Sequence, residues 1–331
     1  MEDFWTNKKV LVTGAGGFIG SHLVERLAET GASVRVFVRY NSRGDPGLLR
    51  LASPETLANL ELVGGDLRDP DAVRKVVSGC QIVFHLGALI SIPYSYRHPA
   101  EVAETNFMGT LNVLIACRDL EVQRLIHTST SEVYGTAQRT PIDESHPLQG
   151  QSPYSASKIG ADKLVESFYC TYQLPAVTIR PFNTYGPRQS ARAVIPTIIT
   201  QALANRTIHL GNLDAIRDFT YVDDTVNGFM CAASVGDIEG GTFNLGTGTE
   251  IKVGDLAEKI IRKVGTQAKI EVDSERIRPQ KSEVLRLLSD NSLARSQLGW
   301  SPSVSLDDGL DKTIEWIKGN LDRYRIGIYE L

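Results

Sequence analysis

Three glycines at three-residue spacing constrain the fold of this chain more than any other feature. Gly14, Gly17 and Gly20 follow the apolar, β-branched segment 10–13 and lead into segment 18–30, where apolar residues recur at helical spacing. In this strand–turn–helix context a Gly-x-x-Gly-x-x-Gly pattern indicates dinucleotide binding. Gly14 permits the tight turn, Gly17 lets a pyrophosphate approach the backbone, and Gly20 lets the helix pack against the strand. The positive end of that helix would then face the phosphates.

The end of the second predicted strand bears on the choice of dinucleotide. NAD-binding proteins usually carry an acidic residue there, to bind the ribose 2′-hydroxyl, but this chain has Arg39. A guanidinium suits a 2′-phosphate, so the sequence favours NADP over NAD, although Arg39 could also be a solvated surface charge. Asp66 follows the third strand and is expected to face the adenine. The expected cofactor-binding residues are Gly14, Gly17, Phe18, Ile19, Gly20, Arg39, Asp66, Leu67, Leu86, Ala88, Tyr154 and Lys158.

Composition excludes several classes of protein. The 331 residues exceed one typical domain, and 42% of them are hydrophobic, enough for a buried core. The net charge of −4 argues against a general nucleic-acid or membrane role. No signal peptide or transmembrane run is expected. Cys80, Cys117, Cys170 and Cys231 fit no metal or disulfide spacing, so we expect reduced thiols in a cytoplasmic protein without a metal.

Strand-like and helix-like segments alternate up to about residue 182, which predicts an α/β fold of Rossmann type with a doubly wound parallel sheet. The expected strands are 10–13, 34–38, 60–63, 81–86, 124–129 and 176–180, and the expected helices include 100–118, 154–172, 192–204, 253–264 and 304–318. Residues 242–246 resemble one more strand of the first sheet. The predicted dinucleotide-binding domain is 1–182 plus about 218–248. A smaller, interleaved α/β substrate domain comprises about 183–217 plus 249–331.

Tyr154 and Lys158 form a Tyr-x-x-x-Lys pair at the start of a predicted helix, where both side chains share one face. An ammonium at Lys158 is expected to lower the pKa of Tyr154, so that the tyrosine can act as a base in alcohol oxidation. Thr130 follows a predicted strand and is placed to hydrogen-bond the same hydroxyl. The bland alternative is a tyrosine at a helix start with a surface lysine.

Glu132 extends this chemistry beyond a plain dehydrogenase. Oxidation of a sugar alcohol to a ketone acidifies the neighbouring C–H bond, and a carboxylate nearby can remove that proton and drive loss of a β-hydroxyl. The reduced cofactor can then return its hydride to the alkene. The alternative is that Glu132 is structural.

The chain resembles a known family in several motifs. They are Gly14-x-x-Gly17-x-x-Gly20, Asp66, Thr130-Ser131-Glu132, Tyr154-x-x-x-Lys158, the segment 180–187 and the segment 217–224. Together they resemble the extended short-chain dehydrogenase/reductases that act on nucleotide sugars, and among these the 4,6-dehydratases. Segments 146–154 and 180–192 are similar to the N-acetylhexosamine dehydratases of the legionaminic acid pathway, and the Thr-Ser-Glu motif is similar to that of the GDP-mannose 4,6-dehydratases.

This resemblance implies roles for individual residues. Thr130 and Tyr154 would hold and deprotonate the C4 hydroxyl with support from Lys158, and Glu132 would take the C5 proton. Dehydratases of dTDP-glucose carry an acidic Asp where this chain has Ser131, so here either Glu132 or a water held by Ser131 would protonate the leaving C6 hydroxyl. The implied substrate-binding residues are Asn183, Arg188, Arg217, Arg278 and Glu283.

Other readings remain open on the sequence alone. The principal expectation is a 4,6-dehydratase acting on a nucleotide-diphosphate N-acetylhexosamine such as GDP-GlcNAc. A nucleotide-sugar 4-epimerase needs the Tyr and Lys but not Glu132, and a UDP-glucuronate decarboxylase shares Thr-Ser-Glu. A non-catalytic cofactor-binding regulator is disfavoured by the intact Thr130, Tyr154 and Lys158.

The resemblance also implies a homodimer through a four-helix bundle. The helices at 100–118 and 154–172 would pair across a twofold axis. Phe107, Leu111, Leu164 and Phe168 are candidates for the exposed faces, although they could equally belong to the core of a monomer.

Overall fold

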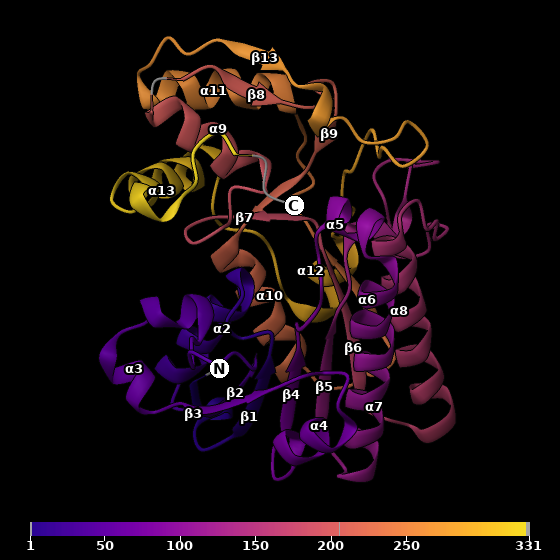
Figure 1. Ribbon diagram of the computed structural model, residues 1–331. Helices are drawn as coiled ribbons and strands as arrows, with labels where there is room; N and C mark the ends of the chain where they lie inside the picture. The colour runs from indigo at the N-terminus through magenta and orange to yellow at the C-terminus, as the bar shows by residue number, and fades with distance from the viewer. Residues whose placement is uncertain (1, 205, 329–331) are drawn as a thin grey trace.

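A computed structural model describes residues 2–204 and 206–328 and divides into two parts (Figure 1). One part holds a seven-stranded sheet in the spatial order β11-β6-β5-β4-β1-β2-β3, with every neighbouring pair parallel. The strands are β1 (Lys9–Thr13), β2 (Ser33–Arg39), β3 (Glu61–Gly65), β4 (Ile82–His85), β5 (Arg124–Thr128), β6 (Ala176–Pro181) and β11 (Thr242–Leu245). The predicted Rossmann-type doubly wound α/β fold is confirmed, including the late return of residues 242–245 to the first sheet.

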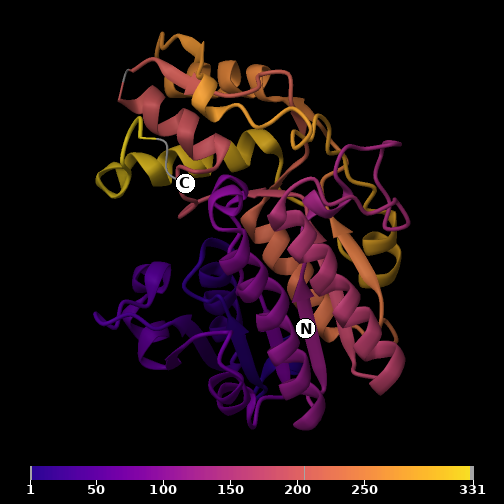
Figure 2. The same cartoon turned by 45° about the vertical axis from the view of Figure 1, so that its right-hand side comes forward.

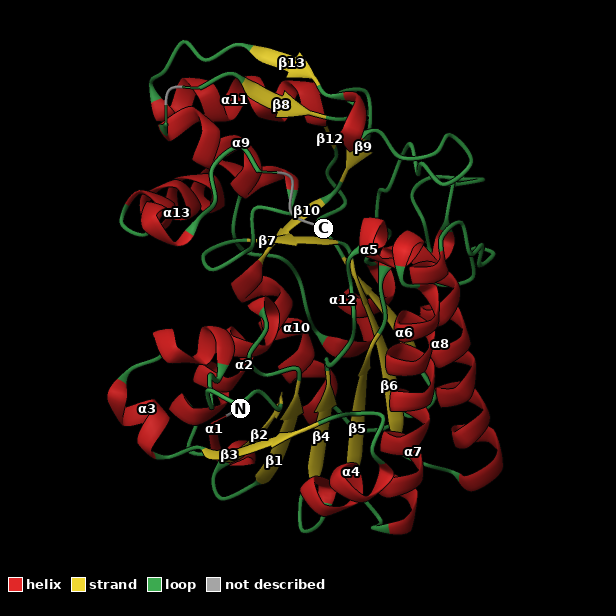
Figure 3. Ribbon diagram, in the orientation of Figure 1, coloured by secondary structure: helices red, strands yellow, loops and turns green. Residues whose placement is uncertain are grey.

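Helices cover both faces of the sheet because successive strand residues point to opposite sides. In β1, Val10 and Val12 join one buried core and Leu11 joins another. The first core lies under α2 (Phe18–Glu29) and α10 (Val222–Ser234), and the second under α4 (Pro70–Val77), α7 (Gly109–Asp119) and α8 (Pro153–Tyr172). Figure 3 shows the strand arrows of this sheet pointing toward the second part of the molecule.

The second part is built from later segments of the chain. Its helices are α9 (Val194–Leu203), α11 (Val253–Val264) and α13 (Leu306–Lys318), and its short strands are β7 (Asn183–Tyr185), β8 (Ile208–Leu210), β9 (Ile216–Arg217), β10 (Phe219–Tyr221), β12 (Ile251–Lys252) and β13 (Ile270–Val272). The chain therefore crosses into this part after β6 and returns for α10 and β11. The remaining helices are α1 (Glu2–Trp5), α3 (Pro54–Ala58), α5 (Ile92–Arg97), α6 (Pro99–Ala103) and α12 (Ser292–Leu298), and the short helical turns are η1 (Gly47–Leu51), η3 (Ser131–Tyr134), η4 (Ser274–Arg276) and η5 (Leu321–Arg323).

The helix predicted over 100–118 is interrupted by a π-helical segment at Glu104–Met108. Asn106 within it is buried, and its carbonyl accepts a hydrogen bond of 2.6 Å from the hydroxyl of Thr110. Its side-chain amide reaches the carbonyl of Leu89 and the hydroxyl of Ser157. Such π-bulges are frequent at functional sites, and this one ties the loop after β4 to α8.

The structure decides between the two places considered for the apolar residues of α7 and α8. These helices lie side by side (Figures 1 and 2). Phe168 is buried in the core, Phe107 packs against Gly160 of α8, and Leu111 and Leu164 pack partly buried against the same core. The exposed apolar side chains of this region are instead Met108, Ile115, Tyr169 and Tyr172.

Candidate active site

The glycine turn has the backbone geometry that its sequence requires. Gly14 has φ +68°, a conformation that L side chains rarely adopt, and a Cβ there would lie 2.7 Å from the nitrogen of Gly87. A Cβ at Gly20 would lie 2.3 Å from the carbonyl oxygen of Gly14. The N-cap of α2 is Gly17, and no side chain caps it. The first N–H groups of α2 are thus accessible from the cavity above them, where they suit an anion.

A cavity of about 1380 Å³ runs from this turn to the second part of the molecule. It lies at the carboxyl ends of the parallel strands, where ligands bind in open α/β sheets. Residues of the glycine turn line one end, Thr130, Glu132 and Tyr154 line the middle, and Arg217 and Arg278 belong to the second part. Residues of both parts line the cavity, so both parts can contact one ligand.

Nine of the twelve expected cofactor residues line this cavity, and Asp66, Leu67 and Lys158 do not. Those in the lining are Gly14, Gly17, Phe18, Ile19, Gly20, Arg39, Leu86, Ala88 and Tyr154. Asp66 lies outside the lining, where its carboxylate accepts hydrogen bonds from Arg68, which holds the pKa of Asp66 near 2. Leu67 packs directly against Gly87 and Gly109, and it would collide with a Cβ at either position.

Local capping fixes Tyr154 and Lys158 on α8. Ser152 caps the helix through the N–H of Ser155, whose hydroxyl in turn accepts from the N–H of Ser152. Tyr154 therefore lies in the first turn, with its ring buried beside Thr130 and Glu132. Lys158, one turn later and 4% exposed, donates to the carbonyl of Thr128 at 2.6 Å.

The expectation that Lys158 lowers the pKa of Tyr154 is wrong for this structure. Burial raises the pKa of Tyr154, a hydrogen bond with Thr130 opposes the rise, and the charges of Glu132 and Asp162 reinforce it. The ammonium of Lys158 is directed at the carbonyl of Thr128 instead. Burial also lowers the pKa of Lys158 from 10.5 to about 8, which means that the folded protein disfavours the charged form of this lysine.

This buried ammonium should cost stability. Lys158→Met should increase the free energy of unfolding at pH 7 by about 1–3 kcal/mol, because the folded state no longer buries a charge whose pKa is lowered. Between pH 8 and 10.5 the unfolded wild type binds more protons than the folded wild type, so its stability rises with pH and the advantage of the variant shrinks. Urea unfolding at several pH values measures this difference. A variant less stable than wild type at pH 7 would contradict it.

A buried polar network behind Lys158 has no counterpart in the predictions from sequence. The carboxylate of Asp162 accepts from the hydroxyl of Ser129 at 2.8 Å, from Arg180 at 2.9 Å and from the Nε2 of His127 at 3.2 Å. Burial alone would raise the pKa of Asp162, but these partners and Lys158 hold it below its usual range. The signal in the sequence was the second four-residue step along α8, from Lys158 to Asp162. This network supports the strand end from which Thr128 and Thr130 extend.

His85 is bonded at both ring nitrogens, to Thr13 at 2.8 Å and Thr110 at 3.1 Å. Burial lowers its pKa well below the usual value. It therefore serves as a neutral connector between β1, β4 and α7 rather than as a proton donor.

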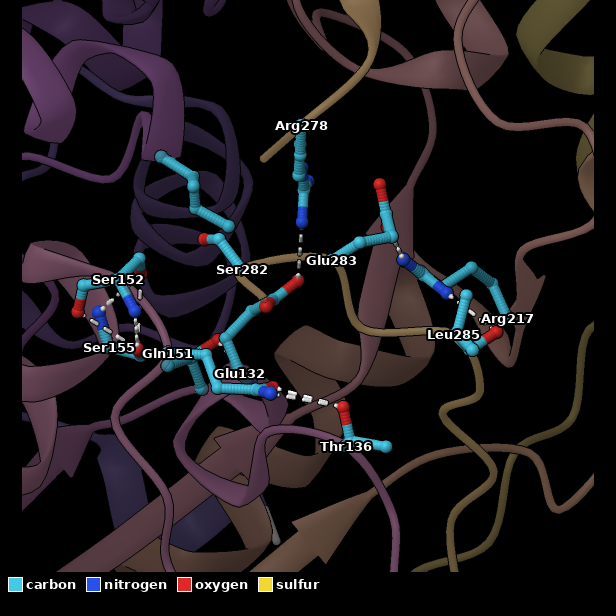
Figure 4. Close-up of polar contacts among 12 residues, drawn as sticks. Glu132, Thr136, Gln151, Ser152, Ser155, Arg217, Arg278, Ser282, Glu283 and Leu285 are labelled. Carbon is cyan, nitrogen blue, oxygen red and sulfur yellow. Dashed lines mark hydrogen bonds and ion pairs between the residues drawn. The ribbon is translucent and has the colours of Figure 1, made fainter. Parts of the chain in front are cut away.

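Glu132 faces Arg278 in this cavity, and the pair of Arg217 and Glu283 lies nearby (Figure 4). Glu132 Oε1 lies 3.6 Å from Arg278 Nη1, and Arg217 Nη2 lies 3.5 Å from Glu283 Oε1. Arg217 also donates to the carbonyl of Ile216 at 2.9 Å. Burial lowers the pKa of Arg217, and the carboxylates of Glu132 and Glu283 oppose that shift. Four charged side chains from distant segments thus face one part of the cavity.

The other expected substrate residues differ in their surroundings. Asn183 lines the cavity and its amide donates to the carbonyl of Asp218 at 3.2 Å. Arg188 also lines it, but its guanidinium pairs with Glu25 at 2.6 Å and reaches Ser21, so it fastens the segment after β7 to α2. Ser131 is buried and lies outside the cavity lining, where it is not placed to hold a water against a ligand.

Asp218, next to Arg217, has a structural role that the sequence did not predict. It is buried and accepts backbone N–H groups of Thr247 at 2.8 Å, Gly248 at 2.9 Å and Ser289 at 3.2 Å. These bonds fix the segment that carries Arg217 against the end of β11. The arginine is thereby positioned by the fold of both parts.

Within 2–204 and 206–328, no group of three or more His, Cys, Asp or Glu side chains is arranged to hold a metal ion. Over the same described residues, no helix combines the length and apolar character needed to cross a bilayer.

The fold and the Tyr–Lys site define the short-chain dehydrogenase/reductase class that acts on nucleotide sugars. A family model described as GDP-mannose 4,6 dehydratase matches residues 11–313, and the chain belongs to this family. Two of its relatives have names that give different reactions. A UDP-glucose 4-epimerase of Mycolicibacterium smegmatis is 35% identical over 317 residues, covering 94% of this chain and 98% of that protein. A dTDP-D-glucose 4,6-dehydratase of Homo sapiens is 31% identical over 327 residues, covering 96% and 92%.

A solved structure agrees with both the fold and the class. DesIV, a dTDP-glucose 4,6-dehydratase from Streptomyces venezuelae with NAD bound, has a TM-score of 0.85 and 30% identity, covering 96% of this chain and 99% of that chain. The chain is therefore a nucleotide-sugar dehydratase or epimerase by family, with dehydratases and epimerases about equally similar to it.

Proposed function

We propose that the chain is a nucleotide-sugar 4,6-dehydratase, which converts a nucleotide-activated hexose to its 4-keto-6-deoxy product. The observation that carries the proposal is Glu132, which lines the same cavity as Thr130 and Tyr154. Oxidation of an alcohol needs a base only for the hydroxyl, here Tyr154, so a carboxylate at the same place suits the elimination that follows. The proposed substrate is a nucleoside-diphosphate N-acetylhexosamine such as GDP-GlcNAc.

In this reaction Thr130 holds the C4 hydroxyl and Tyr154 accepts its proton as C4 becomes a ketone. A bound nicotinamide cofactor supplies a hydride acceptor at C4 and a hydride donor at C6. The ketone acidifies the C5 proton, which Glu132 removes while the C6 hydroxyl leaves as water. Glu132 can pass the proton that it has taken to the departing hydroxyl, since Ser131 lies outside the cavity. A proton returned to C5 completes the balance.

We propose a division of binding between the two parts. Residues 1–182 plus about 218–248 hold the dinucleotide, with Lys158 and Tyr154 at its nicotinamide end. Residues of about 183–217 plus 249–331 hold the nucleotide sugar through Asn183, Arg217, Arg278 and Glu283. The accessible N-terminus of α2 and the glycine turn fit a pyrophosphate, and paired arginines suit a diphosphate.

We propose NADP as the preferred cofactor, on the basis of Arg39. Its guanidinium lines the cavity, with a 65% exposed side chain and a weak ion pair to Glu101 at 3.4 Å. DesIV, which is similar to this chain, was solved with NAD. The affinities of this chain for NADP and for NAD therefore decide which cofactor it prefers. Arg39→Ser should weaken NADP binding by roughly 10-fold or more and leave NAD binding nearly unchanged, because only NADP brings a phosphate to that guanidinium. Titration calorimetry with both cofactors measures it. A wild type that binds NAD more tightly would contradict the preference.

We further propose a cytoplasmic homodimer. The exposed Met108, Ile115, Tyr169 and Tyr172 give the α7–α8 surface an apolar face that a second copy could cover. The four cysteines are unpaired, as reduced thiols in the cytoplasm would be. Sedimentation of a monomer alone at micromolar concentration would refute the dimer.

The 4-epimerase is the second candidate. Two observations favour it: the 35% identity to an epimerase and the absence of Ser131 from the cavity lining, which leaves the site with a single candidate acid. An epimerase would oxidise C4 with Tyr154 and would have no use for Glu132. Comparing the masses of product and substrate distinguishes the two reactions.

A further inference from the structure

The charge cluster formed by Glu132, Arg217, Arg278 and Glu283 contains equal numbers of carboxylates and guanidinium groups. All four side chains line the cavity. Their exposed fractions are 15% for Glu132, 27% for Arg278, 9% for Arg217 and 12% for Glu283. Such half-buried pairs are screened less than surface pairs, so exchanging a partner has a measurable consequence.

The two ion pairs join different segments of the molecule. Arg217 is anchored by the carbonyl of Ile216 at 2.9 Å in addition to Glu283. Arg278 extends from the chain after η4 and meets Glu132, which belongs to the opposite part of the molecule, at 3.6 Å. This distance is an ion pair without a good hydrogen bond. The Glu132–Arg278 ion pair therefore joins the two parts of the molecule, and a dashed line marks it in Figure 4.

A nucleoside diphosphate entering between the arginines would compete with the carboxylates for them. A diphosphate offers several charged oxygens in the geometry that a guanidinium binds best. A carboxylate oxygen directed at a guanidinium is poorly placed to take a proton from carbon. In the proposed reaction Glu132 must do so, and releasing Oε1 from Arg278 makes that oxygen available for the C5 proton.

We propose that the diphosphate of the substrate replaces Glu132 as the partner of Arg278, and that this exchange frees Glu132 to face the sugar. We call the Glu132–Arg278 ion pair the mask, because it keeps Glu132 from the sugar until the diphosphate binds. The inference rests on the proposed function for the role of Glu132, but not for the competition itself. Glu132 becomes available as the base only when a diphosphate occupies the site. Glu132 also weakens the binding of a diphosphate without a sugar, because the diphosphate has to displace its carboxylate from Arg278.

The competition is measured with uridine, guanosine and thymidine diphosphates, which lack the sugar and cannot react. Titration calorimetry on the cofactor-loaded enzyme should show that Glu132→Gln binds the preferred diphosphate about 5-fold or more tightly than wild type. Arg278→Gln should bind it more weakly. In the Arg278→Gln background, adding Glu132→Gln should change the diphosphate affinity little, because the guanidinium for which Glu132 and the diphosphate compete is gone.

This double-mutant cycle separates the mask from a general electrostatic effect. If Glu132→Gln tightened binding equally in both backgrounds, the carboxylate would act only through its long-range field, and the proposal would fail. It would also fail if Glu132→Gln left binding unchanged or if no diphosphate bound either protein. Unaltered cofactor affinity of each variant shows that the fold is retained. A positive cycle in an enzyme that dehydrates no sugar would sustain the mask and reject the proposed reaction.

Discussion

Tyr154→Phe should reduce turnover of the nucleotide sugar by about 10²–10⁴-fold, the range that a positioned acid or base contributes. The phenolate form of Tyr154 is the group that can accept the C4 proton, and its ring lies beside Thr130 in the cavity. Phenylalanine keeps the buried ring and removes only the hydroxyl. Steady-state kinetics with mass detection of product measure the loss, and cofactor binding should stay within about 2-fold of wild type because the ring still packs on the same wall.

Tyr185→Phe provides the matched control for the loss of a buried hydroxyl. Tyr185 also lines the cavity, but its hydroxyl donates to the carbonyl of Leu306 at 3.3 Å. We expect this variant to lose some stability and to retain most of its turnover. A Tyr154→Phe enzyme as active as Tyr185→Phe would remove the proton acceptor from the proposed mechanism.

Glu132→Gln should abolish elimination, again by about 10²–10⁴-fold, while oxidation at C4 continues. The amide is similar in size to the carboxylate and cannot take the C5 proton. Mixing this variant with cofactor and substrate should therefore produce the near-ultraviolet absorbance of reduced nicotinamide without release of a dehydrated sugar. Rapid mixing with absorbance detection, followed by mass analysis, records both steps.

Glu283→Gln tests whether the loss is specific to one cavity carboxylate. Glu283 pairs with Arg217 and lies in the same charge cluster. We expect a higher KM, since Glu283 is itself among the residues proposed to hold the nucleotide sugar, with a much smaller change in kcat. Equal damage from both substitutions would mean that charge balance in the cluster, rather than a base at Glu132, limits the reaction.

The sequence predicted the sheet well because its strands are continuous apolar runs that end at polar residues. Thr130, Glu132 and Tyr154 could be placed at one edge since parallel strands bring their carboxyl ends together. The glycine turn was equally predictable, because Gly14 and Gly20 leave no room for a Cβ.

Predictions that depended on side-chain direction were less successful. The pKa of Tyr154 is raised by burial, and sequence spacing alone could not show that Lys158 would turn to the carbonyl of Thr128. Likewise, helical periodicity marked Phe168 as apolar but could not tell a face that covers the sheet from one left exposed. Asp66, which is expected to face the adenine, accepts from Arg68, and the position of Asp66 after a strand does not indicate this partner.

Contacts between the two parts were beyond prediction for a different reason. Glu132 and Arg278 are far apart in the sequence and meet only because the chain returns across the cavity after η4. Asp162 and Arg180 belong to one part, but they too meet only because a helix and a strand pack together. No local pattern encodes such pairs.

The central claim is that this chain dehydrates a nucleotide sugar. Incubating the protein with guanosine-, uridine- and thymidine-diphosphate sugars in heavy water, and weighing the products, tests it most directly. We predict that one substrate loses a water and gains one deuterium, because the proton returned to C5 comes from solvent. A product of unchanged mass without deuterium would mean epimerisation at C4, and would contradict the role proposed for Glu132.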